Sequence, residues 1–319
     1  MIVKYRGTSI KKRKLEALIR RLPRNHPKIQ SIIEDLNKHI SGIKGEESLD
    51  YYLNFLDNKK FHIFQDLRLK GANGAFQLDF LLVALEFILI IEAKNYVGEI
   101  IIEEKYNQLT KKHNDKEEYY PDPIRQVLHQ RFQLITWLKE NNFTVPPIEM
   151  LVVFTNTNSR VQTIASTPIY KNNIIRSTLL IEKINSLTQS HNRGMLDLNT
   201  HKKISKKLLK SHTPLDENLI TKYNIDINDI ITGVQCPNCL STPIQKIRAN
   251  WVCSICNSIS KDAHLLAIED YALLIKDKFS ISEIREFFNL ESKSIATKLI
   301  TKLNLKHEGK SKGRIYTYK

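Results

Sequence analysis

The chain has 319 residues, of which 41% are hydrophobic and 26% charged, so it can bury a substantial core and is not dominated by disorder. Lysine and arginine number 49 against 34 aspartates and glutamates, which gives a formal net charge of +15. An excess of that size favours a polyanionic partner such as nucleic acid. The longest apolar stretch, residues 80–91, is far shorter than the roughly 20 residues that span a bilayer, so we expect a cytoplasmic protein without membrane contact.

Composition and periodicity divide the chain into five parts. The first is basic, because residues 1–30 hold ten lysines or arginines and one glutamate, and the second alternates helical and strand patterns. The predicted parts, in order, are a basic N-terminal arm and helix (1–40), an α/β domain (41–195), a linker with helical character (196–232), a cysteine-containing segment (233–260) and a helical domain with a basic tail (261–319).

Within the α/β part, two strand-like runs at residues 77–85 and 87–97 are separated by almost nothing, so they predict a hairpin. Residues 105–122 are polar and charged and predict a loop. Asp122-Pro123 then supplies an N-cap and a first-turn proline for a helix. The expected architecture is a mixed sheet flanked by helices.

The hairpin places acidic residues among apolar ones. If its strands pair antiparallel around Leu85-Glu86, opposed residue numbers sum to 171, and Asp79 faces Glu92. Two carboxylates opposed in an apolar sheet repel each other and lose hydration, which fold stability does not require. A divalent cation would relieve that repulsion, and Mg²⁺ binds one or two carboxylates together with waters and phosphate oxygens.

Lys94 lies on the same strand face as Glu92, two residues further along. It could orient or deprotonate an attacking water, or stabilise charge on a phosphate, so the set suits metal-assisted phosphodiester hydrolysis. The alternative is structural: Asp79 would end a strand in solvent, and Glu92 and Lys94 would form an ordinary surface pair.

These residues carry a resemblance to a known family. Gly45-Glu46, the run from Phe76 to Asp79, and Ile91-Glu92-Ala93-Lys94-Asn95 followed by Gly98 resemble the nuclease-related domain (NERD) family, a branch of the PD-(D/E)XK nuclease superfamily. The later segment from Asp122 to Gln126 resembles the family's glutamine-bearing helix. The resemblance covers roughly residues 40–160 and departs from the superfamily motif at Leu78, which stands where a proline precedes the acid.

The resemblance implies a restriction-endonuclease-like α/β fold and assigns roles. Asp79 and Glu92 would hold a catalytic Mg²⁺ or Mn²⁺, and Lys94 would act on water or phosphate. Glu46 would be a further acidic ligand or base, with the adjacent Glu47 left open in that role. Gln126 would position water or phosphate, or else lie on an exposed helix face.

The four cysteines form two C-x-x-C pairs, Cys236 with Cys239 and Cys253 with Cys256, separated by thirteen residues. Four thiolates at this spacing suit a structural Zn²⁺ in a zinc ribbon, because a closed tetrahedral set leaves no position for substrate. Two such pairs so close together argue against a redox role. The ribbon would either contact nucleic acid through Lys246, Arg248 and Trp251 or only stabilise the fold.

The C-terminal region reads as a winged-helix-like module. Helical spacing over residues 265–275 is followed by a helix capped by Ser280, a second helix opening at Ser292, and a basic hairpin. In such a module the second helix enters the DNA major groove and the hairpin contacts phosphates. A helical packing module with a solvated basic face is the alternative. The residues expected to contact nucleic acid are Lys293, Thr297, Lys298, Lys302, Lys310, Lys312 and Arg314.

Two functions are consistent with these features. The first is a Mg²⁺-dependent endonuclease acting on DNA, with RNA left open, and targeted by the zinc ribbon and the winged-helix-like module. The second is a non-catalytic nucleic-acid-binding or regulatory protein on a degenerate nuclease scaffold. Cleavage of both strands would favour a homodimer, and the sequence leaves open partner proteins of a defence or repair system.

Overall fold

We describe the chain from a computed structural model, which describes residues 1–72, 74–191, 194–310 and 313–318. Contacts divide it into two units. Unit 1 comprises Met1–Thr8 and His39–Leu215, and unit 2 comprises Ser9–Lys38 and Asp216–Lys319. This division groups most of the expected N-terminal arm with the C-terminal part of the chain, and it splits the expected linker between the two units.

Unit 1 is built on a six-stranded mixed sheet with the order β1-β2-β3-β4-β8-β10. Strands β2, β3 and β4 pair antiparallel, whereas β1 joins β2, β8 joins β4 and β10 joins β8 in parallel. The central strands are nearly continuous apolar runs because both faces of the sheet are covered. The strand bounds are β1 Ile2–Lys4, β2 His62–Gly71, β3 Gly74–Val83, β4 Ile88–Lys94, β8 Ile148–Phe154 and β10 Ile174–Arg176.

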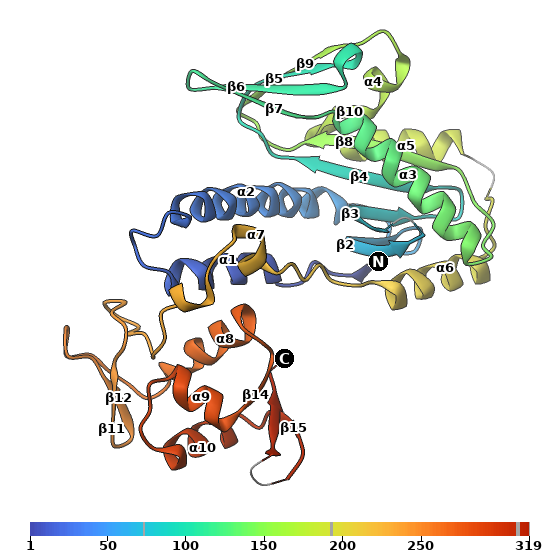
Figure 1. Cartoon of the computed structure of the whole chain (residues 1–319). Helices are drawn as coiled ribbons and strands as arrows, with labels where there is room; N and C mark the ends of the chain where they lie inside the picture. The colour runs from blue at the N-terminus through green and yellow to red at the C-terminus, as the bar shows by residue number, and fades with distance from the viewer. Residues whose placement is uncertain (73, 192–193, 311–312, 319) are drawn as a thin grey trace. The chain divides into compact units, whose positions relative to one another are not determined.

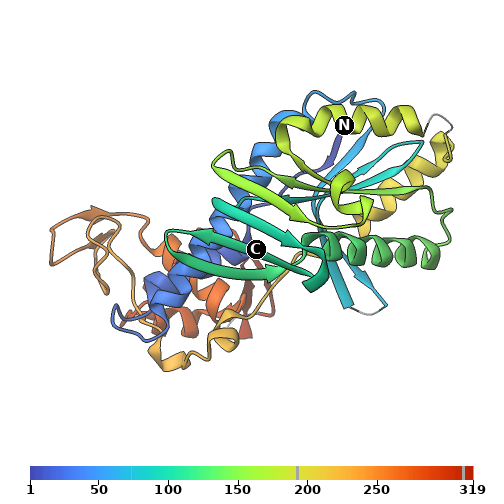
Figure 2. The same cartoon turned by 90° about the horizontal axis from the view of Figure 1, so that it is seen from above.

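Helices cover both faces of this sheet (Figure 1). On one face, α3 (Pro123–Glu140) and α6 (Leu198–Ser211) pack on β2, β3 and β4 around a core that includes Trp137 and Ile204. On the other, α2 (Ile29–Leu53) and α5 (Leu180–Ser190) pack around Leu49 and Ile184. Helix α3, green in both views, lies along the sheet in Figure 2 as well. The predicted α/β architecture is therefore confirmed.

A second sheet of four strands, in the order β7-β6-β5-β9, corrects the prediction of a loop over residues 105–122. Residues 108–113 and 116–121 pair as an antiparallel hairpin, in which Lys111 bonds Glu118 across the strands. The hairpin was missed because its residues are polar and only Leu109 and Thr110 are buried. The strand bounds are β5 Gly98–Glu103, β6 Gln108–His113, β7 Lys116–Pro121 and β9 Ser159–Ile164, and the short helices of this unit are η1 Glu104–Tyr106, α4 Pro168–Asn173 and η2 Ser177–Leu179.

Unit 2 has one continuous core. Residues of α1, the start of α2, the cysteine segment and the C-terminal helices all contribute to it, among them Leu18, Trp251 and Phe288. The helix and strand bounds are α1 Ile10–Arg21, α7 Leu219–Tyr223, η3 Ile227–Asp229, β11 Gln245–Ile247, β12 Asn250–Val252, β13 Ile259–Ser260, α8 His264–Leu274, β14 Lys278–Ser280, α9 Ile281–Phe287, α10 Lys293–Thr301, β15 Lys306–Glu308 and β16 Ile315–Thr317.

The C-terminal elements begin at the residues that the sequence indicates. Ser280 caps α9 with a full capping box to Glu283, and the side chain of Ser292 caps α10. Strand β16 lies between β14 and β15 in a three-stranded antiparallel sheet. In the described part of the chain, no helix combines the length and the apolar character needed to cross a membrane.

Candidate functional site

The hairpin of β3 and β4 has the predicted register. Phe80 pairs with Ile91 and Val83 with Ile88, so the paired residue numbers sum to 171. The same register carried one step further brings Asp79 opposite Glu92. The Asp79 side chain reaches across to β4, where its Oδ2 accepts a hydrogen bond of 2.9 Å from the backbone N–H of Ala93.

Glu92, Lys94 and Gln126 form a closed set of hydrogen bonds. Lys94 Nζ donates to Glu92 Oε1 at 2.8 Å and to Gln126 Oε1 at 2.9 Å. Gln126 Nε2 in turn donates to Glu92 Oε1 at 2.7 Å. Glu92 is only 4% exposed, so these contacts satisfy a carboxylate that is almost removed from water. The predicted Glu92, Lys94 and Gln126 are therefore brought together by β4 and α3.

Gln130 completes this set and was not predicted from the sequence. Its Nε2 donates to Glu92 Oε2 at 2.9 Å and to the backbone oxygen of Gln77 at 3.1 Å. Asp122 starts α3 by accepting a hydrogen bond from the N–H of Ile124, and residues four apart then share one helix face. The spacing of Gln126 and Gln130 was the signal that could have indicated both.

Glu46 reaches the same region from α2. The helix approaches β4 closely at Gly45, where an added Cβ would lie 2.5 Å from the Cβ of Asn95. Asn95 itself donates to the backbone oxygen of Ser41 at 2.7 Å. The side chain of Glu46 is 19% exposed and faces Arg6, whereas Glu47 is exposed. Of the two adjacent acids, Glu46 is the one that lies in the cluster.

Charge and burial act differently on the ionisable groups of the cluster. Burial, followed by the negative charges of Glu92 and Glu46, raises the pKa of Asp79 well above its usual value. Burial also raises the pKa of Glu46, although Arg6 opposes the shift. Burial lowers the pKa of Lys94, but Glu92, Tyr96 and Asp79 together outweigh it, so the pKa is raised and the side chain is an ammonium at neutral pH.

The donor chemistry of this cluster fits a hard divalent cation. Asp79, Glu92 and Glu46 offer carboxylate oxygens, which Mg²⁺ and Mn²⁺ prefer, and burial with the charges of Glu92 and Glu46 raises the pKa of Asp79 although Lys94 opposes the shift. Mg²⁺ commonly takes only one or two carboxylates and completes its shell with water and phosphate oxygens. Asp79 and Glu92 are the residues that would hold it.

The four cysteines form a second candidate metal centre, in unit 2. Their sulfur atoms all lie within 4.8 Å of one another. The Sγ atoms of Cys236 and Cys256 are 3.7 Å apart, and those of Cys239 and Cys253 are 3.5 Å apart. Tetrahedral coordination at the usual zinc–sulfur distance places sulfurs about 3.8 Å apart. The cluster could therefore bind zinc, and it is compatible with the predicted zinc ribbon.

The residues expected to contact nucleic acid lie mostly on the surface of unit 2. Lys293 and Lys298 are exposed on α10, Lys302 is exposed directly after it, and Thr297 is half-buried. In the hairpin, Lys310 is exposed and Arg314 is half-buried, while Lys312 lies outside the described residues. Lys246 Nζ lies 5.3 Å from the centre of the Trp251 ring, which is itself buried.

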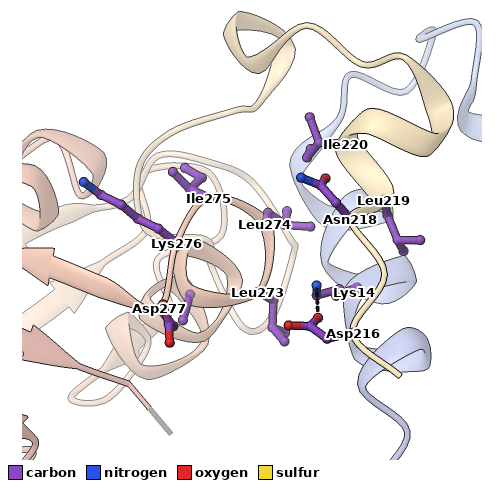
Figure 3. Close-up of a pocket in the computed structure, with 11 residues that line it drawn as sticks. Lys14, Asp216, Asn218, Leu219, Ile220, Leu273, Leu274, Ile275, Lys276 and Asp277 are labelled. Carbon is purple, nitrogen blue, oxygen red and sulfur yellow. Dashed lines mark hydrogen bonds and ion pairs between the residues drawn. The ribbon is translucent and has the colours of Figure 1, made fainter. Parts of the chain in front are cut away.

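A cavity of about 220 Å³ lies elsewhere in unit 2 (Figure 3). Residues of α1, the start of α7 with the segment before it, and the end of α8 with the residues after it line the cavity, and Lys14 pairs with Asp216 at one side. Neither the carboxylate cluster nor the cysteines contribute to its walls.

The carboxylate cluster lies in the part of the chain that matches a known family. Residues 41–155 match the family model described as nuclease-related domain. This range contains Glu46, Asp79, Glu92, Lys94 and Gln126, so the family resemblance drawn from the sequence is confirmed. No curated protein and no solved structure matches the chain.

Proposed function

We propose that this protein is a divalent-metal-dependent endonuclease that hydrolyses phosphodiester bonds in DNA. The observation that carries the proposal is the convergence of Asp79, Glu92 and Lys94 with Glu46 in a domain that matches a nuclease-related family. Carboxylates and an ammonium side by side, with a glutamine bonded to both, are the groups that phosphodiester hydrolysis needs.

Each side chain has a distinct role in this proposal. The divalent ion would polarise the scissile phosphate and lower the pKa of a bound water. Asp79 and Glu92 would fix its position. Lys94, held as an ammonium by Glu92, stabilises negative charge on the phosphate rather than removing a proton from water. Gln126 holds the side chains of Lys94 and Glu92 in place through hydrogen bonds to both.

Unit 2 would bring the enzyme to its substrate. The element order of α8, β14, α9, α10, β15 and β16, with β16 central in the sheet, supports a winged-helix-like module. Two exposed lysines on α10, a third directly after it and the basic hairpin fit phosphate contacts, which give salt-dependent and largely sequence-independent affinity. In this proposal the cysteines hold a structural Zn²⁺, because all four ligand positions are filled by protein.

A second candidate function is nucleic-acid binding without catalysis. Glu92 supports it, because its two oxygens already accept hydrogen bonds from Lys94, Gln126 and Gln130. Among the described residues, the acids are also not gathered as tightly as the cysteines. Three of the roughly four acceptor positions of this carboxylate are thus occupied, so a metal ion would compete with these donors for Glu92.

A plasmid-nicking assay separates the two candidates. The purified full chain would be incubated with supercoiled plasmid and Mg²⁺ or Mn²⁺, alongside Asp79→Ala, Lys94→Ala and Glu46→Ala. Glu47→Ala is the matched control, because Glu47 is the exposed neighbour of Glu46. We expect nicking by the wild type and the control, and at least about a hundredfold loss in the other three variants. Equal nicking by all five proteins would eliminate the nuclease proposal, and DNA binding without any nicking would favour the second candidate.

A further inference from the structure

Arg6 contacts the candidate site from outside the matched domain. It follows β1, which pairs in parallel with β2 at the edge of the main sheet. Its side chain is 11% exposed, and its Nε donates to Glu46 Oε2 at 2.7 Å. A second guanidinium nitrogen donates to Asp50 Oδ2 at 3.1 Å. One arginine therefore bridges two acids that lie one turn apart on α2.

Several further contacts fix the position of this arginine. Its backbone N–H donates to Gln65 Oε1 at 2.9 Å, and Gln65 Nε2 donates to Asp50 Oδ1 at 2.8 Å. The guanidinium carbon lies 5.2 Å from the centre of the Phe80 ring, and Phe80 directly follows Asp79 in β3. A side chain held from this many directions has little rotational freedom left to lose when a ligand binds.

Asp50 and Glu46 differ in how many of their carboxylate oxygens accept hydrogen bonds. Both oxygens of Asp50 accept hydrogen bonds, from Arg6 and Gln65, so Asp50 is committed to holding Arg6 in place. Glu46 receives a hydrogen bond at Oε2 only, among the described residues, so Oε1 keeps its lone pairs for another partner. Arg6 thus orients the Glu46 carboxylate without consuming it.

We propose that Arg6 is a positioning residue for the nuclease site: its guanidinium fixes the Glu46 carboxylate, whose other oxygen would be available as a ligand for the divalent cation. This inference rests on the proposed function. It adds a residue that lies 35 positions before the matched range begins at residue 41. Groups that orient a metal ligand through hydrogen bonds change metal affinity by about 10- to 100-fold when they are removed.

Binding of Mn²⁺, followed by electron paramagnetic resonance on the full chain, tests this role without a cleavage assay. We expect Arg6→Gln to weaken Mn²⁺ binding at least about tenfold and Arg6→Lys to recover part of the loss, because lysine keeps the charge but not both contacts. Arg160→Gln removes an exposed arginine of the same unit and should bind Mn²⁺ like the wild type.

A double-variant comparison separates positioning from general damage to the fold. If Arg6 acts through Glu46, Arg6→Gln should cost no further affinity in a Glu46→Gln background. An equal loss in both backgrounds, or wild-type affinity in Arg6→Gln, overturns the inference while leaving the proposed nuclease intact. If Arg6→Gln does not fold, Arg6→Lys decides, since wild-type affinity in that variant overturns the inference equally. A wild type that binds no Mn²⁺ rejects the proposed function and the inference together.

An independent observation concerns the outer face of α6. Its buried side presents His201, Ile204, Ser205 and Leu208 to the sheet. The five lysines of the helix are all exposed, and none forms an ion pair within the described residues: Lys202, Lys203, Lys206, Lys207 and Lys210. Three pairs among them are four residues apart, a spacing at which like charges destabilise a helix.

We infer that this lysine face of α6 binds nucleic-acid phosphates. Packing does not require the charges, since every buried contact of the helix comes from its other side. No acidic residue interrupts the sequence from Leu198 to Ser211, so the face presents uncompensated positive charge. A row of unpaired ammonium groups is complementary to a polyanionic backbone, and releasing its counterions drives association.

The test is DNA binding in metal-free buffer, measured by fluorescence anisotropy at several KCl concentrations. The variant Lys206→Gln/Lys210→Gln should lower the slope of log affinity against log salt by about two. The control Lys59→Gln/Lys60→Gln removes two exposed lysines from a turn of the same unit and should leave the slope unchanged. An unchanged slope in the α6 variant overturns the inference. Weakened binding to phosphatidylserine vesicles with unchanged DNA binding overturns it as well and assigns the face to a membrane surface.

Discussion

Asp79 and Glu92 are neighbouring carboxylates in different electrostatic situations. Glu92 accepts hydrogen bonds from an ammonium and two amide groups, so its charge is compensated without a metal. Asp79 receives one backbone N–H and faces the negative charges of Glu92 and Glu46. Ionisation of Asp79 is therefore the costly step in the metal-free protein, and it is the residue whose charge a cation would relieve.

Asp79→Asn should stabilise the magnesium-free protein at neutral pH. A raised pKa in the folded state means that folding is favoured while Asp79 is protonated and is penalised as the pH rises through that pKa. The wild type should therefore lose thermal stability from about pH 4 upwards relative to Asp79→Asn. Melting curves at pH 4.5 and 7.5, with zinc retained, measure this, and a variant less stable than the wild type at both values contradicts it.

Glu92→Gln should, in contrast to Asp79→Asn, destabilise the magnesium-free protein. An amide at this position would present a donor to Gln126 or Gln130 and would leave the Lys94 ammonium without its carboxylate. We expect a loss of about 1–3 kcal/mol in the free energy of unfolding, the usual cost of an unsatisfied buried group. Urea denaturation of both variants in magnesium-free buffer provides the comparison, and equal stability of the two would reject the distinction drawn between the acids.

The sequence predicted the residues that local geometry determines. The register of β3 and β4 followed from a short turn and alternating side chains, and the strands pair as predicted from Phe80 with Ile91 to Val83 with Ile88. Gln130 was within reach of the same reasoning through its helical spacing from Gln126. Arg6 was not, because its contact with Glu46 joins residues 40 positions apart and depends on β1 adding to the edge of the sheet.

At the scale of elements, α2 determines where Glu46 lies. The helix runs over Ile29–Leu53 and contains two glycines. A Cβ added at Gly42 would have no atom within 4 Å, whereas one added at Gly45 would meet Asn95 and Thr155 at 2.5 and 3.0 Å. The glycine at position 45 is therefore needed for close approach to β4 rather than for an unusual backbone conformation.

Gly45→Ala and Gly42→Ala should have opposite effects. A methyl group at position 45 meets the Asn95 side chain and pushes α2 away from β4, so we expect lower thermal stability and displacement of Glu46. At position 42 the methyl group meets open space, and alanine should stabilise the helix by up to about 1 kcal/mol. Thermal melting of the two variants tests the contrast, which would fail if both changes were neutral.

The β6–β7 hairpin is an element that the sequence pattern does not predict. Its strands show no regular alternation of apolar and polar residues, and their side chains are mostly lysine, glutamate and tyrosine, which also occur in loops. Pairing is instead supported by cross-strand contacts, such as Lys112 with Glu117, and by the neighbouring strand β5. These contacts form only when the two strands come together, and the composition of each strand does not reveal them. The polar composition alone therefore predicted a loop.

At the scale of the whole molecule, the cysteine segment is part of the core of unit 2. The Trp251 ring stacks on His264, with 6.0 Å between ring centres, and meets Phe288 edge-on. Cys236 and Cys253 are themselves fully buried in the same cluster as residues of α1 and α8. The sequence placed a zinc ribbon beside a helical domain, but this shared core depends on long-range packing that spacing does not encode.

Removal of zinc should therefore loosen most of unit 2 and not only residues 236–256. Without the metal the cysteine sulfurs take up protons and no longer hold the two C-x-x-C pairs together, so the buried Trp251 and Phe288 would lose the packing that the ribbon provides. Hydrogen exchange with a strong zinc chelator should show lost protection in α8, α9 and α10, with β2, β3 and β4 unchanged because their core consists of other residues. Added zinc should restore the protection. Exposure confined to the cysteine segment would mean that the helices fold without it, whereas loss of protection in β3 and β4 would mean that the two units do not unfold independently.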